Sequence, residues 1–164
     1  MDKDISIALL NKAVADELQA VHQYMYFHFH LDDQGFSPLA GLFRGIAIQE
    51  MGHVELLAER ILFLKGDVKM ELAGPVEPIT DPEKMVACAA EMEQTSAADY
   101  NKWALECSAN ADSASKQIFE SLVSDEEGHY DTFDKQAENI KRFGPSYLAL
   151  QSFEELGGKA DSNA

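Results

Sequence analysis

Basic side chains are scarce in this chain of 164 residues. Only 13 lysines and arginines stand against 29 aspartates and glutamates, and the formal net charge is −16. Because contacts to phosphate need clustered lysine and arginine, this shortage argues against a DNA or RNA partner. The excess of carboxylates is instead suited to attracting cations.

Long apolar stretches are also missing. No run approaches the roughly 18 apolar residues that a transmembrane helix needs, so we expect no contact with a membrane. The first four residues, Met-Asp-Lys-Asp, lack the basic and apolar segments of a signal peptide. Since 46% of the residues are hydrophobic, the chain can nevertheless bury a sizeable core, and its length fits one domain.

Cysteine is too rare to build a disulfide framework, because the chain has only Cys88 and Cys107. Both lie in one predicted helix, where 19 residues of separation place them about 28 Å apart. A disulfide needs Cα atoms within roughly 7 Å of each other. We therefore expect free thiols, with Cys107 packed in the core, and a reducing, cytoplasmic location.

Apolar residues recur with a helical period through most of the chain. The expected helices are residues 4–31, 38–64, 82–109 and 113–143, with a short fifth helix at 147–156. Ser37 is expected to cap the second helix, followed by Pro38 in its first turn, and Gly66 is expected to cap its end. The predicted domain spans residues 1–156, and residues 157–164 are predicted to form a flexible tail.

The connections between these helices predict their arrangement. Helices of this length are about 40 Å long, and the short first and third connections favour antiparallel hairpins. The middle connection, from about residue 65 to 81, can span about 55 Å when extended, which is enough to run the length of a bundle. We expect an all-α fold: an antiparallel four-helix bundle of ferritin type with one long crossover and a short C-terminal fifth helix.

The two predicted hairpins repeat a pattern of acidic and imidazole side chains. The first contains Glu17, Glu50 and His53, and the second contains Glu93, Glu126 and His129. In both hairpins, 33 residues separate the two glutamates. Each Glu-x-x-His pair has the i, i+3 spacing that places both side chains on one helix face. Tyr24 and Tyr100 each follow the lone glutamate by seven residues, on the same face.

All six repeated residues fall within apolar helix faces. Four carboxylates in one core repel each other and are costly to desolvate unless they are paired or bind metal. A single Glu-x-x-His is usually a surface pair. A single glutamate that the spacing places on an apolar helix face usually means that the position of that face in the sequence was assigned wrongly. Two lone glutamates combined with two such pairs on four helices are typical of di-iron bundles. The pattern therefore predicts a centre for two iron ions, each with one imidazole ligand.

The chain resembles the bacterioferritins, a family of the ferritin-like di-iron carboxylate superfamily, over residues 5–155. The matching segments include residues 10–12, 17–18, 22–24, Glu50-Met51-Gly52-His53, 59–64, Asp125-Glu126-Glu127-Gly128-His129 and 140–144. This resemblance implies ferroxidase activity in which Fe(II) is oxidised by O₂ or hydrogen peroxide. It also implies iron storage as ferric mineral inside a hollow homo-oligomeric cage, usually a 24-mer built of two-fold dimers.

The resemblance also implies a role for each residue of the repeat. Glu17, Glu50 and His53 would serve one iron, and Glu93, Glu126 and His129 the other. Glu50 and Glu126 would bridge the two ions, and Tyr24 would lie just outside the ligands. Two irons in one site could then give the oxidant two electrons together.

Met51 matches the methionine that ligates a b-type haem between two subunits of bacterioferritins, although methionine equally suits an apolar interface. Its neighbour Gly52 replaces a basic residue of some relatives, which removes a partner for a haem propionate. Arg44, Gly45 and Gln49 replace residues of an auxiliary iron site on the inner cage wall. We expect that auxiliary site to be lost and the main site to be unaffected.

Two other functions share parts of this pattern. A peroxide-reducing di-iron protein of rubrerythrin type usually carries a Cys-x-x-Cys module, which this sequence lacks. A DNA-protecting mini-ferritin places its ligands between subunits, and the net charge of −16 disfavours DNA. The repeated set within one chain therefore favours the bacterioferritin interpretation.

Overall fold

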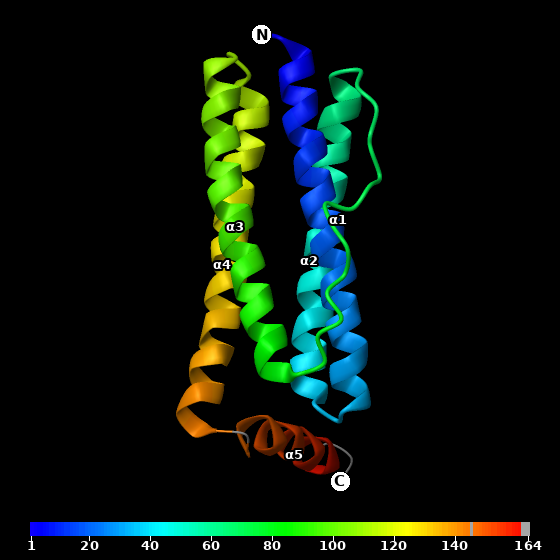
Figure 1. The fold of residues 1–164 in the computed structure, drawn as a ribbon, viewed down its shortest axis with the longest axis vertical. Helices are drawn as coiled ribbons and strands as arrows, with labels where there is room; N and C mark the ends of the chain where they lie inside the picture. The colour runs from blue at the N-terminus through cyan, green and yellow to red at the C-terminus, as the bar shows by residue number, and fades with distance from the viewer. Residues whose placement is uncertain (145, 162–164) are drawn as a thin grey trace.

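Five helices make up the part of the chain that the structure, a computed structural model, describes, namely residues 1–144 and 146–161 (Figure 1). They are α1 (Lys3–Asp33), α2 (Ser37–Phe63), α3 (Pro82–Ala109), α4 (Ser113–Phe143) and α5 (Ser146–Asp161). The described residues contain no strand, so the predicted all-α class is confirmed.

The four long helices run side by side as two antiparallel hairpins, α1–α2 and α3–α4 (Figure 1). A long connection leaves the end of α2, descends along α1, and starts α3 at the opposite end of the bundle. α5 lies across the end of the bundle at which α4 finishes. The predicted four-helix bundle with one long crossover is confirmed.

The crossover is attached to one face of α1 by side chains that the sequence analysis did not single out. Asn11 accepts the Lys69 N–H at 2.8 Å and donates to the Asp67 carbonyl at 3.0 Å. The amide groups of Gln19 and Gln23 bind the crossover backbone in the same two-way manner. Asn11, Gln19 and Gln23 are separated by eight and four residues, spacings that place them on one helix face. They satisfy backbone groups of a segment without regular structure.

The turn between α1 and α2 differs from expectation in its cap. Gly35 adopts a left-handed φ of 84°, and the Phe36 N–H donates to the Leu31 carbonyl at 2.9 Å. This turn lets α2 begin at Ser37, with Phe36 as the N-cap and no side-chain cap bond. Ser37 is therefore the first helical residue, and its predicted role as the cap was wrong.

Gly66 was expected to cap the end of α2, but it lies one residue beyond the position that a capping glycine occupies. Lys65 is the left-handed residue, with φ of 69°, and the Gly66 N–H bonds to the Ile61 carbonyl at 3.0 Å. A Cβ on Gly66 would lie 2.8 Å from the Ile7 Cγ2 atom. Glycine is thus required at residue 66 by close packing against α1, and not by its backbone angle.

Aspartates cap the second hairpin. Asp81 accepts the Lys84 N–H at 3.1 Å, and Asp112 accepts the Ser115 N–H at 3.1 Å. Asp112 also pairs with Arg60 of α2 at 2.6 Å. A contact between helices from different hairpins therefore reinforces the start of α4.

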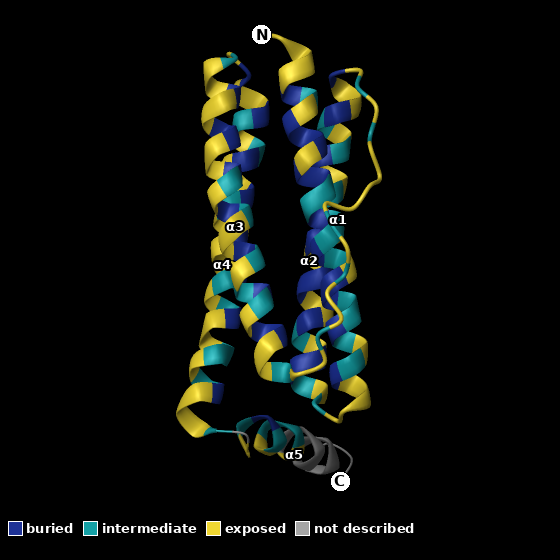
Figure 2. Ribbon diagram, in the orientation of Figure 1, coloured by how far each residue is buried: buried dark blue, intermediate teal, exposed yellow. Residues whose placement is uncertain are grey.

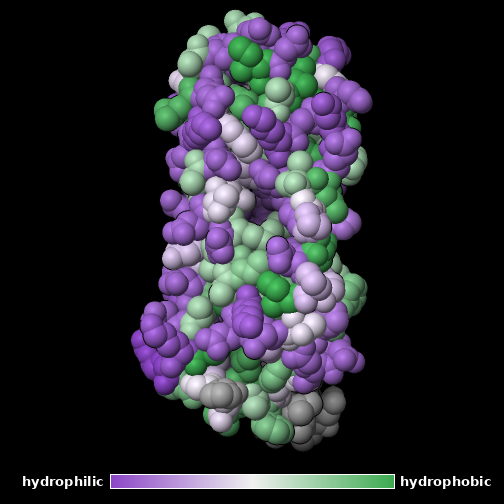
Figure 3. Space-filling view, viewed as in Figure 1, coloured by the Kyte–Doolittle hydropathy of each residue, from purple (hydrophilic) through white to green (hydrophobic). Residues whose placement is uncertain are grey.

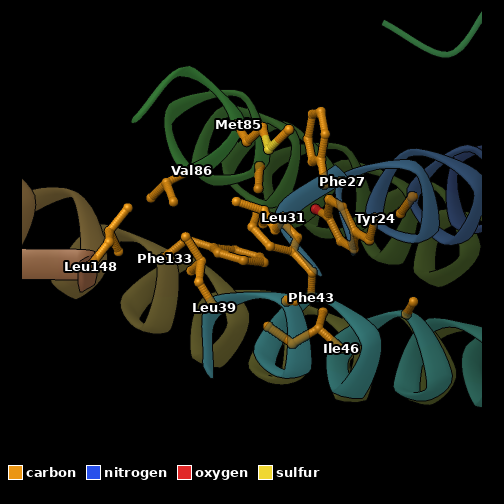
Figure 4. Packing of buried hydrophobic residues seen from close by; sticks show 14 of the residues in the cluster. Tyr24, Phe27, Leu31, Leu39, Phe43, Ile46, Met85, Val86, Phe133 and Leu148 are labelled. Atoms are coloured by element: carbon orange, nitrogen blue, oxygen red, sulfur yellow. The ribbon is translucent and has the colours of Figure 1, made fainter. Parts of the chain in front are cut away.

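The buried residues form two apolar clusters that fill the two halves of the bundle, and they line the inward faces of the helices in Figure 2. In one cluster the rings of Tyr24, Phe43 and Phe133 converge from three helices, with centroid separations of 4.9–5.7 Å (Figure 4). Leu148 of α5 closes the end of the same cluster. On the face of the bundle seen in Figure 3, hydrophilic side chains alternate with apolar patches.

Three remaining expectations concern the tail, the thiols and the membrane. α5 continues to Asp161, beyond the predicted end at residue 156, because no proline stops it and glycine weakens a helix without forbidding it. Residues 162–164 of the predicted tail lie outside the described residues.

Cys107 is buried, Cys88 is partly buried, and both thiols are free, as predicted. No described helix is both long and apolar enough to cross a membrane.

Candidate metal centre

The six repeated residues meet between the two apolar clusters, near the middle of the bundle. α1 contributes Glu17, α2 contributes Glu50 and His53, α3 contributes Glu93, and α4 contributes Glu126 and His129. Each is at most 9% exposed. The cores around them hold the four helices at a fixed spacing, which brings side chains far apart in sequence into contact.

Within this cluster, two groups of four residues offer ligand atoms that all lie within 4.8 Å of one another. One group is Glu17, Glu50, His53 and Glu126, and the other is Glu50, Glu93, Glu126 and His129. The two groups share Glu50 and Glu126. Carboxylate oxygen and imidazole nitrogen are ligands that suit iron. The residues are thus arranged for two adjacent ions with two shared carboxylates.

Both imidazoles turn the Nδ1 atom inward. The Nδ1 of His53 lies 2.8 Å from Glu50 Oε2 and 3.2 Å from Glu126 Oε1. The Nδ1 of His129 lies 3.0 Å from Glu50 Oε1 and 3.6 Å from Glu93 Oε2. The same nitrogen of each ring therefore faces the carboxylates in both halves of the repeat.

Two buried tyrosines hold the lone glutamates crosswise. The Tyr24 hydroxyl of α1 donates to Glu93 Oε1 of α3 at 2.5 Å, and the Tyr100 hydroxyl of α3 donates to Glu17 Oε1 of α1 at 2.7 Å. Burial and the nearby carboxylates raise the pKa of both phenols well above 10. Both tyrosines therefore remain hydrogen-bond donors. Tyr24 lies next to the cluster as predicted, and Tyr100 is its counterpart in the second half.

The ionisation of the cluster shows how crowded its charges are. Burial raises the pKa of Glu17 to about 8 and that of Glu126 to about 11. Burial alone would raise the pKa of Glu50 as well, but the two imidazoles that face its oxygens lower it to about 2. Burial would lower the imidazole pKa values, but the carboxylates raise them to about 12 for His53 and about 10 for His129. Without metal, protons on these glutamates and histidines therefore balance the charge of the carboxylates, and metal cations could take the place of those protons.

Hydrogen bonds within the described part of the chain leave five buried atoms of the cluster without a partner. They are both carboxylate oxygens of Glu50, Glu126 Oε1, and the Nδ1 atoms of His53 and His129. Their short separations do not have hydrogen-bond geometry. Because unpaired buried polar atoms are rare and costly, such a set is suited to metal ions. The residues present therefore fit a pair of cations.

Two further residues contact the outer face of the imidazoles, and sequence reasoning missed both roles. The His129 Nε2–H donates to Gln49 Oε1 at 2.6 Å, and the His53 Nε2 lies 3.5 Å from Asp125 Oδ2. Gln49 was expected to matter only to the auxiliary site, whereas the helical register of α2 places its side chain against His129 of the main cluster. The signal in the sequence was that each residue directly precedes a glutamate of the repeat.

Met51 lies apart from this cluster. It is 54% exposed on α2, while the adjacent Glu50 is fully buried. Successive helix residues point about 100° apart, so one helix presents Glu50 inward and Met51 outward. Ile48, three residues earlier on the same face, is 51% exposed. Arg44, Gly45 and Gly52 are also exposed on α2.

The fold and the cluster together define a class: a ferritin-like four-helix bundle with a two-metal type of centre. The family model described as "Ferritin-like domain" matches residues 7–143. The bacterioferritin of Rhodobacter capsulatus is 37% identical over 88% of this chain and 89% of its own length. That of Desulfovibrio desulfuricans is 34% identical over 87% of this chain and 80% of its own. The chain belongs to the bacterioferritins.

Solved structures agree with the sequence relatives. The Desulfovibrio desulfuricans bacterioferritin, whose diiron site was studied in different catalytic states, has a TM-score of 0.88 at 34% identity and covers 90% of this chain and 86% of its own. The Rhodobacter capsulatus protein has a TM-score of 0.87 at 34% identity and covers 93% of this chain and 94% of its own. That structure has a metal-free dinuclear site and a haem iron in a crystallographic special position.

Proposed function

We propose that this chain is a ferroxidase of iron storage and detoxification that oxidises Fe(II) to Fe(III) with O₂ or hydrogen peroxide. One observation carries the proposal. Five buried ligand-type atoms from α2 and α4 have no hydrogen-bond partner in the described part of the chain, and they face two further glutamates from α1 and α3. A bundle that gained nothing from metal would replace such a set by apolar residues, because burying it is costly.

In this proposal Glu17, Glu50 and His53 hold one iron, and Glu93, Glu126 and His129 hold the other. Glu50 and Glu126 would serve both ions, in keeping with their membership of both groups. The iron pair supplies the redox chemistry, since each Fe(II) can give up one electron. The carboxylates favour the more highly charged Fe(III) product. Tyr24 and Tyr100 fix the two lone glutamates in orientation through their hydroxyl groups.

The test is oxidation of anaerobically added Fe(II) after exposure to air, followed by absorbance of Fe(III). Glu50→Ala and His129→Ala are expected to remove the rapid phase, because each takes away a ligand. Glu55→Ala, an exposed change on the same helix as Glu50, is the matched control and should leave the rapid phase unchanged. Rapid oxidation that persists in both cluster variants would contradict the proposed centre.

A b-type haem held by Met51 is the second part of the proposal. Three features support it: Met51 is exposed, it lies beside exposed Ile48, and the Rhodobacter capsulatus relative has a haem iron. A two-fold pair of chains would bring one Met51 from each to the same haem. Reconstituted protein should show a Soret band that Met51→Leu abolishes and that Met70→Leu, a change of exposed methionine in the crossover, preserves. Unchanged haem binding in Met51→Leu would contradict this role.

We further propose that 24 chains, arranged as two-fold dimers, enclose the ferric mineral. The membership of the chain in the bacterioferritins supports this assembly. At 18.2 kDa per chain, a 24-mer has a mass of about 440 kDa, following the closed symmetry of soluble oligomers. Light scattering after size exclusion should give that mass, and a 12-mer of mini-ferritin type or a lone dimer would contradict it. A cytoplasmic location stays a prediction.

A further inference from the structure

A polar side chain stands behind each imidazole of the cluster, and both occupy equivalent places in the repeat. Gln49 directly precedes Glu50 on α2 and contacts His129 of α4. Asp125 directly precedes Glu126 on α4 and contacts His53 of α2. Each hairpin therefore supplies a residue that braces the imidazole of the other hairpin.

The contact of Gln49 determines which nitrogen of His129 is available to a metal. A metal binds the neutral form of an imidazole, which has one N–H and one lone pair. Because the Nε2–H is held by Gln49 Oε1 at 2.6 Å, the proton that a metal would replace is the one on Nδ1. That Nδ1 faces inward, 3.0 Å from Glu50 Oε1 and without a hydrogen-bond partner among the described residues.

The two braces differ in kind. Gln49 is also an exposed residue, but its neutral amide makes a direct hydrogen bond of 2.6 Å to His129. Asp125 is a carboxylate whose side chain is 54% exposed and whose oxygen lies 3.5 Å from His53 Nε2. Solvent weakens the interaction of such an exposed charge. The orientation of His129 therefore depends on its brace more than the orientation of His53 does.

We propose that Gln49 is a positioning residue for the metal position served by His129, holding this ring in the Nε2–H form with Nδ1 directed at the metal. The inference rests on the proposed two-metal centre and adds a residue that lies outside its ligands. Partners behind metal-bound histidines typically change metal affinity 10–100-fold when they are removed. Loss of the Gln49 amide should therefore weaken one of the two metal positions and spare the other.

Titration with Co(II) alone, read by calorimetry and by the visible absorption of the bound ion, tests this proposal without turnover. Gln49→Leu removes the acceptor and keeps a similar size, so we expect one of two binding steps to weaken about 10–100-fold. Gln49→Glu keeps an acceptor for the Nε2–H and should restore that step. Gln94→Leu is the control, because Gln94 is an exposed glutamine that directly follows Glu93. It should bind two Co(II) ions like the unaltered protein.

The possible outcomes separate this inference from the proposed function. If the unaltered protein binds fewer than two Co(II) ions per chain, the two-metal centre itself fails. If it binds two and Gln49→Leu binds both equally well, only the role of Gln49 fails. A Gln49→Glu variant as weak as Gln49→Leu would also overturn the role, because the loss would then not come from the missing acceptor.

Discussion

Changing Tyr24 to phenylalanine removes one oxygen atom beside the cluster. The hydroxyl is fully buried and donates to Glu93 Oε1 at 2.5 Å. The ring itself packs between Phe43 and Phe133, with centroids 5.7 Å and 5.5 Å away, and phenylalanine keeps these contacts. The substitution therefore isolates the hydrogen bond.

The size of the effect follows from the group that is left behind. A buried acceptor that loses its donor costs about 1–3 kcal/mol. We expect Tyr24→Phe to lower the free energy of unfolding by that amount. It should also weaken metal binding about 10–100-fold, because Glu93 loses the contact that orients it. That loss corresponds to about 1.4–2.8 kcal/mol.

Denaturant unfolding and Co(II) titration measure the two effects separately. Tyr100→Phe should behave alike, since its hydroxyl donates to Glu17 at 2.7 Å. Tyr26→Phe is the control, because the Tyr26 hydroxyl makes no hydrogen bond within the described part of the chain. If Tyr24→Phe matches Tyr26→Phe in both stability and metal affinity, the proposed positioning by Tyr24 is refuted.

Three further changes test the fold around the centre. Asp112→Ala removes the α4 cap and leaves Arg60 unpaired, so denaturant unfolding should show a loss of about 2–4 kcal/mol. Hydrogen bonds of its carboxylate outweigh burial and lower the pKa of Asp112. The part of its stabilisation that depends on ionisation should therefore be complete at neutral pH and decrease as the pH falls below about 4, so the difference between the variant and the unaltered protein should narrow there. Gly66→Ala places a Cβ 2.8 Å from Ile7 Cγ2 and should cost about 1–3 kcal/mol by overpacking, whereas an equal melting temperature would contradict the close approach. Chelation of Co(II) present at 100 times its dissociation constant should remove about 2.7 kcal/mol of stability for each ion bound, and a melting temperature unaffected by the metal would contradict binding to the folded state.

The helices and the bundle could be predicted because each helix has an amphipathic period and because the middle connection is long enough to cross the bundle. The cluster could be predicted because the repeat places Glu17 and Glu93 on the faces that carry the cores. These features depend on local spacing, and a single sequence displays local spacing directly.

The contacts that support the centre could not be predicted in the same way. Gln49 meets His129 across 80 residues of sequence, and Gln23 meets the crossover backbone at Glu77. Such pairs depend on how one helix is rotated about its axis relative to another. The periodicity of apolar residues determines that rotation only to within one or two residue positions. The cap at Ser37 was wrong for a related reason, since the left-handed turn at Gly35 moved the start of α2.

The central claim is that each chain oxidises iron at a centre for two ions. Its most direct test is stepwise anaerobic addition of Fe(II) to the protein, with each sample then exposed to air and followed by stopped-flow absorbance. The amplitude of the rapid phase should rise linearly and stop increasing at two Fe(II) per chain, one for each of the two ligand groups. A break at one Fe(II) per chain, or no rapid phase at all, would contradict the account.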